Sequence, residues 1–136
     1  MKNSVMLTIA SLLSILLATF HITDDVVRGF EPGGFKNVIG IAILVVWLCG
    51  TLLLRERRLG YIIVLLGSLL GSLMPLAHMR HAGLVGGRIA TANGKFFFVW
   101  TLMMLGVTAS FSVILSAHAL WTLRKAKSQT ATEPEQ

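Results

Sequence analysis

The chain has 136 residues, of which 54% are hydrophobic and only 13% are charged, and its mean hydropathy is +0.76. A soluble domain carries about 25% charged residues, so this composition excludes an ordinary water-soluble protein and predicts an integral membrane protein in the lipid bilayer. The net charge is +6, but most basic residues flank apolar runs. This placement is typical of membrane topology, so we expect no nucleic acid as a partner.

Four apolar runs follow one another along the chain and define its expected architecture. Crossing a bilayer core of about 30 Å takes about 20 helical residues, a length that the runs reach with their polar flanks. No run alternates apolar and polar residues as a lipid-facing strand would. We therefore predict an all-α integral membrane protein, a four transmembrane helix bundle over residues 1–127, with helices at about 4–22, 37–54, 60–78 and 96–121.

The first run, residues 5–20, follows Met1 and Lys2 and could instead be a signal peptide. Nothing near Ala18, Thr19 and Phe20 resembles a small-x-small cleavage site, which favours a retained helix.

The distribution of basic residues predicts the orientation of the bundle. With a cytoplasmic N-terminus, the inner segments hold seven basic residues and the outer loops hold five. The inner set is Lys2, Arg55, Arg57, Arg58, Arg124, Lys125 and Lys127, and the outer set is Arg28, Lys36, Arg80, Arg88 and Lys95. This bias predicts both termini in the cytoplasm and a multi-pass protein of the cell inner membrane.

Small residues in the third and fourth runs predict where helices pack. In lipid, helices associate mainly where small side chains allow backbones to approach closely. Pairs four residues apart occupy one face of a helix, and the expected packing residues are Gly67, Ser68, Gly71, Ser72, Gly106 and Ser110. The sequence does not say whether these faces pack within the chain, in a homo-oligomer or against a membrane partner.

Polar residues directly after the first run, in HITDDVVRGF at residues 21–30, are the main candidates for a site. If the helices continue past their apolar cores, His21 shares a helical face with Asp24 or Asp25, and His78 shares one with His81. All five residues would lie at the extracytoplasmic ends of the first and third helices. Imidazoles and carboxylates in this combination suit a divalent transition metal.

Two other interpretations of these residues stay open. Polar residues collect at helix ends because the membrane interface is where they cost least, and Asp24 can pair with Arg28 at i, i+4. Alternatively, His21 and His78 could be the axial ligands of a haem, although the chain has no C-x-x-C-H motif. The metal interpretation requires the first and third helices to converge at these residues.

The remaining features favour a protein without catalysis. No G-x-S-x-G, H-E-x-x-H or Walker motif is present, and the central parts of the four runs hold no Asp, Glu, Lys or Arg. His118 is expected near the inner face beside Trp121, and the polar segment 128–136 is expected to be a disordered cytoplasmic tail.

We therefore predict a protein that acts through helix packing with itself or a membrane partner. The glycine-rich connection at 79–95 would be a further contact surface. The alternative is a metal- or haem-binding membrane protein that uses the polar residues at the extracytoplasmic ends of the first and third helices.

Overall fold

The structure is a computed structural model that describes residues 2–29, 34–81 and 94–130, although the side chains of Lys2, Lys36, 79–81 and Thr130 are not described. Within these ranges the chain forms four α-helices and no strands. They are α1 (Lys2–Val27), α2 (Phe35–Leu52), α3 (Arg58–His81) and α4 (Lys95–Thr130). The prediction of an all-α four-helix architecture is confirmed. Most of the glycine-rich connection, residues 82–93, lies outside the described residues.

Helix α1 runs five residues past its expected end at residue 22. The amide of Arg28 still donates to the carbonyl of Asp24, and the helix stops at Gly29, whose φ of 68° is readily adopted by glycine. The whole segment from His21 to Val27 is therefore helical, which puts residues four apart on one face.

Helix α4 is longer than expected at its C-terminal end: it continues through Thr130 instead of ending near residue 121. Residues 128–130 are thus helical, which corrects the prediction of a disordered tail from residue 128. The physical reason is that no glycine or proline occurs between Gly106 and Pro134 to end the helix. Residues 131–136 lie outside the described residues.

Three helices are long and apolar enough to cross a membrane: Asn3–Val27, Arg58–His78 and Lys95–Gln129. The apolar part of α2, Asn37–Leu52, is shorter. Large apolar side chains such as Val38, Ile41 and Val45 nevertheless remain about half exposed on α2. An apolar surface of this extent fits lipid better than water, so the structure supports a membrane protein.

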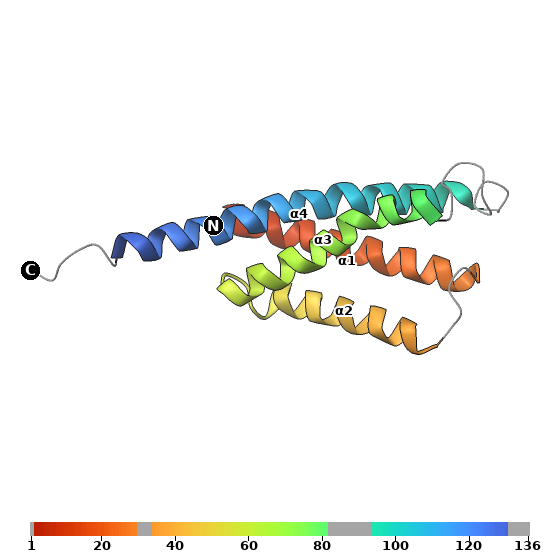
Figure 1. Cartoon of the computed structure of the whole chain (residues 1–136), viewed down its shortest axis with the longest axis horizontal. Coiled ribbons are helices and arrows are strands. Elements are labelled where there is room, and N and C mark those ends of the chain that lie inside the picture. Colours follow the sequence, from red (N-terminus) through yellow and green to blue (C-terminus); the bar gives the residue numbers. More distant parts are fainter. Residues whose placement is uncertain (1, 30–33, 82–93, 131–136) are drawn as a thin grey trace, which may run out of the picture.

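The helices form a bundle in which α4 is the longest element and α3 crosses obliquely from α2 to α4 (Figure 1). Helix α4 packs on α1 and α3, and α2 packs on α1 and α3 but does not contact α4 in the described part of the chain. We call the end with residues 21–29, 34–35, 78–81 and 94–95 the histidine end, and the end with residues 53–57 the arginine end. Toward the histidine end, α3 separates from α2 and approaches α4 (Figure 1).

Buried hydroxyl groups join α1 to its neighbours. The indole of Trp47 donates to Ser11 Oγ at 2.9 Å, and Ser11 Oγ lies 2.7 Å from Thr51 Oγ1. On the other side of α1, Ser14 donates to Thr108 Oγ1 on α4 at 3.1 Å. Polar contacts of this kind stabilise helix association in lipid by about 0.6 kcal/mol each on average.

Candidate metal centre

His21 and Asp25 lie one turn apart on α1 and face the interior of the bundle. Only 1% of His21 and 8% of Asp25 is exposed. A carboxylate and an imidazole rarely reach this degree of burial unless each is paired or bound to an ion.

His78 reaches the same place from α3. Its Nδ1 lies 3.0 Å from the carbonyl oxygen of Met74, one turn earlier in the helix. When this nitrogen carries the proton and donates to the carbonyl, the lone pair is left on Nε2. A histidine that ligates a metal is usually held in this way, with its other nitrogen donating to a carbonyl or a carboxylate.

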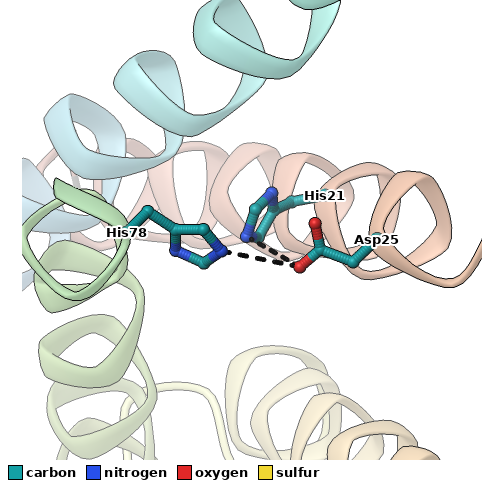
Figure 2. A group of neighbouring side chains, drawn as sticks. All are labelled: His21, Asp25 and His78. Carbon is teal, nitrogen blue, oxygen red and sulfur yellow. Dashed lines mark ion pairs between the residues drawn. The ribbon is translucent and has the colours of Figure 1, made fainter. Parts of the chain in front are cut away.

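The three side chains converge on a single carboxylate oxygen (Figure 2). Asp25 Oδ2 lies 3.5 Å from His21 Nε2 and 3.6 Å from His78 Nε2. The two imidazole rings meet edge to face, with centroids 4.6 Å apart. One ligand atom from each of the three residues lies within 4.8 Å of the other two, so the group could hold a metal ion.

Several polar atoms of this group have no hydrogen-bond partner in the described part of the chain. They are His21 Nδ1, His21 Nε2 and Asp25 Oδ1. The 3.5 Å separation between His21 and Asp25 is longer than a charge-assisted hydrogen bond of about 2.7–2.9 Å. Since nearly all buried polar groups find a partner, these atoms call for an explanation.

An apolar wall and an open cavity surround the group. Phe98, which is fully buried, packs against both imidazole rings with centroid distances of 5.3 Å and 5.6 Å. On the side facing α2, a cavity of about 320 Å³ is lined by all three polar residues and by Asn37. A bound ion would therefore be shielded on one side and accessible on the other.

The other two predicted ligands are placed differently. Asp24 points to Arg28, whose Nε lies 2.6 Å from its carboxylate, and Arg28 also donates to the carbonyl of Gly94 at 3.1 Å. Asp24 thus helps to connect the end of α1 to the start of α4. His81 lies in the last turn of α3, and its side chain is outside the described residues.

The predicted packing glycines face neighbours within the chain. A Cβ atom on Gly67 would lie 2.5 Å from the indole of Trp47, one on Gly71 would lie 3.1 Å from Ala109, and one on Gly106 would lie 2.7 Å from Pro75. The serines are placed less uniformly. Ser68 is fully buried, Ser72 is half-buried and bonds to the carbonyl of Leu69, and Ser110 is exposed.

Three residues near the group did not stand out in the sequence: Asn37, Met74 and Phe98. Asn37 begins an apolar helix and Phe98 belongs to an aromatic cluster, so neither differs from ordinary interfacial or core residues. Met74 acts through its backbone carbonyl, for which a sequence carries no signal.

No protein-family model, curated protein or solved structure matches this chain. The fold is helical with three helices long and apolar enough to cross a membrane, and His21, Asp25 and His78 could hold a metal ion.

Proposed function

We propose that this chain is a membrane protein that binds one divalent transition metal ion, with zinc the best fit, through His21, Asp25 and His78. The observation that carries the proposal is the pair of separations of 3.5 Å and 3.6 Å between two imidazole nitrogens and one buried carboxylate oxygen. These separations are too long for strong hydrogen bonds and close to those between the ligands of a tetrahedral ion.

The comparison with ideal geometry is direct. Zinc–nitrogen and zinc–oxygen bonds are about 2.0–2.2 Å long, so neighbouring ligands of a tetrahedral zinc ion lie about 3.4 Å apart. Neighbouring ligands of an octahedral ion at the same bond length would lie only about 3.0 Å apart. The site geometry therefore favours zinc over an octahedral iron centre with two histidines and one carboxylate.

Electrostatics supports the same assignment. Asp25 is a buried acid between two imidazoles, and its Oδ1 has no donor in the described residues. A divalent ion would balance the carboxylate and bind the lone pair of a His21 nitrogen. It would thereby give a partner to His21 Nε2, one of the three unsatisfied polar atoms of this group.

Haem fits less well. Two axial histidines stand on opposite sides of the iron, and with metal–nitrogen bonds of about 2 Å their ring centroids are separated by roughly 6 Å. The centroids of His21 and His78 are only 4.6 Å apart. The rings contact each other where a macrocycle would have to lie.

The hypothesis of a protein that acts only through helix packing has less support. Gly67, Gly71 and Gly106 face Trp47, Ala109 and Pro75 of the same chain. These small residues are therefore engaged within the bundle. Among the predicted packing residues that the structure describes, Ser110 is exposed. One exposed serine is too little to support a contact with a second copy or a membrane partner, so that contact stays a prediction.

The test is the metal content of the purified protein. After growth with added zinc and purification in detergent, elemental analysis should find about one ion per chain. His21→Ala, Asp25→Asn and His78→Ala should each lose it. His118→Ala and Asp24→Asn are matched controls, because the ring of His118 lies beside Trp121 and Asp24 pairs with Arg28. A folded wild type without metal, or equal loss in the controls, would overturn the proposal.

We also propose the orientation that the basic residues suggest, with both termini in the cytoplasm and the histidine end on the opposite side of the inner membrane. Cys49 is the only cysteine, so Cys49→Ser gives a background for labelling. Ser128→Cys in this background should react with a membrane-impermeant maleimide only after the cells are opened. Labelling in intact cells would reverse the topology.

A further inference from the structure

The metal centre opens on a groove between α2 and α3. The cavity beside the centre, of about 320 Å³, is the first of three that follow one another. It shares His21, Ile22, Gly40 and Met74 with a middle cavity of about 180 Å³. The middle cavity shares Ile43, Trp47, Gly67 and Leu70 with a far cavity of about 350 Å³. We call this series the α2–α3 groove.

The groove changes character along its length. At the metal centre its walls include two imidazoles, a carboxylate and the amide of Asn37. Among the described residues that line the middle cavity, only His21 and Trp47 carry a side-chain nitrogen or oxygen, and the indole N–H of Trp47 is already bonded to Ser11. The far cavity is lined by apolar residues and glycine, apart from the indole of Trp47. A fitting ligand would have one small polar end and a long apolar remainder.

The net charge of the centre with its metal ion bound determines which polar head group the ligand should have. A divalent ion with one carboxylate and two neutral imidazoles has a net charge of +1. Three protein ligands leave a fourth tetrahedral position vacant, as in open zinc sites. In an environment of low dielectric constant a head group with one negative charge and an oxygen ligand would neutralise this centre.

The small volume of the middle cavity determines how many hydrocarbon chains the ligand can have. With about 180 Å³ it is the smallest of the three, so it admits one hydrocarbon chain more readily than two. The far cavity lies among exposed Ile39, Val46 and Leu66, on a surface that faces lipid in a membrane protein. A single chain could therefore enter the groove directly from the bilayer.

From these observations we infer that the α2–α3 groove binds a free long-chain fatty acid, with the carboxylate on the metal ion and the chain along the groove. This inference rests on the proposed metal centre. The inference adds the class of ligand to the proposed metal centre. The ligand is a singly charged, single-chain amphiphile rather than a phospholipid, which has two chains and a larger head group.

The experiment uses full-length protein in detergent, loaded with Co²⁺, whose visible spectrum reports its ligands. Metal content is measured first, so an empty protein overturns the proposed function before any fatty acid is added. Palmitate is then titrated, with acetate and palmitate methyl ester in parallel. We expect palmitate to change the spectrum and to bind at least tenfold tighter than acetate, and the ester to leave the spectrum unchanged.

A substitution in the groove tests the contribution of the hydrocarbon chain to binding separately from that of the carboxylate. A Cβ on Gly40 would meet only the side chain of Ile22, at 3.8 Å. Gly40→Leu should fill the passage between the first two cavities, weaken palmitate at least tenfold and keep its Co²⁺. Ala117→Leu, on an exposed face of α4, is the matched control.

Three outcomes would overturn the inference while leaving the metal centre intact. Palmitate could leave the spectrum of fully loaded protein unchanged. Acetate could bind as tightly as palmitate, which would show that the groove contributes nothing. Radiolabelled palmitate could also bind with the same affinity to wild-type protein from which a chelator has removed the metal, which would show that its head group does not contact the metal.

Discussion

Gly67→Ala should destabilise the bundle, although alanine is the better helix former. A Cβ at residue 67 would lie 2.5 Å and 2.6 Å from two atoms of the Trp47 indole, and real Cβ atoms essentially never approach this closely. Trp47 is only 3% exposed, and its N–H donates to Ser11 at 2.9 Å. The ring therefore cannot move away without losing this hydrogen bond.

The expected magnitude follows from three contributions. Forcing one additional carbon into a packed interior costs about 1–3 kcal/mol. Loss of the hydrogen bond between Trp47 and Ser11 adds about 0.6–1.7 kcal/mol in a membrane helix bundle. Replacing glycine by alanine in a helix returns about 1 kcal/mol. We expect the free energy of unfolding to fall by about 2 kcal/mol.

The measurement is a reversible unfolding titration with sodium dodecyl sulfate in mixed micelles, followed by tryptophan fluorescence and circular dichroism. Gly40→Ala is the control, since its new Cβ has space and should raise the free energy of unfolding by up to about 1 kcal/mol. In a Trp47→Phe background the smaller ring should reduce the cost of Gly67→Ala by about 1 kcal/mol or more. If Gly67→Ala matches Gly40→Ala, or if its cost is unchanged beside Phe, the described contact between α2 and α3 is refuted.

Three further predictions concern the centre and the polar contacts. Zinc at 100 times its dissociation constant should raise the free energy of unfolding by about 2.7 kcal/mol. The measurement is the melting temperature, which should rise with zinc and fall again when a chelator is added. His21→Ala should show no such rise. Ser11→Ala should lower the free energy of unfolding by about 1 kcal/mol and alter the emission of Trp47; unchanged stability would contradict the observed hydrogen bonds. Arg28→Gln, which removes the charged contacts of Arg28 with Asp24 and the carbonyl of Gly94, should lower the free energy of unfolding by about 1.5–3 kcal/mol and leave the metal content unchanged. A loss of metal as large as that in His21→Ala would count against the assigned ligands.

The helical architecture could be predicted from the sequence because long apolar runs leave few alternatives in a bilayer. The helix ends were harder to predict from the sequence. Helix α1 ends at Gly29, beyond the apolar run, and α4 contains no residue that would end it at residue 121. His21, Asp25 and His78 were recognised as candidates from their helical spacing. The pairing of Asp24 with Arg28 at i, i+4 was one of the interpretations that the sequence offered. That Asp25 rather than Asp24 faces His78 could not be predicted, because it depends on how α1 packs against α3.

The path of α3 explains why the metal centre and the groove occur together. At the histidine end α3 lies against α4, and this brings His78 across to α1. Helices α2 and α3 lie side by side at the arginine end and separate toward the histidine end (Figure 1), and a cavity bordered by Asn37 and Gly40 of α2 lies beside His21 and Asp25. Glycines at 40, 67 and 71 keep this space open, because larger side chains there would occupy the middle cavity. The same crossing that assembles three ligands therefore leaves their open side facing an apolar passage to the lipid, so a substitution that brought α2 closer to α1 should close the groove before it disturbed the centre.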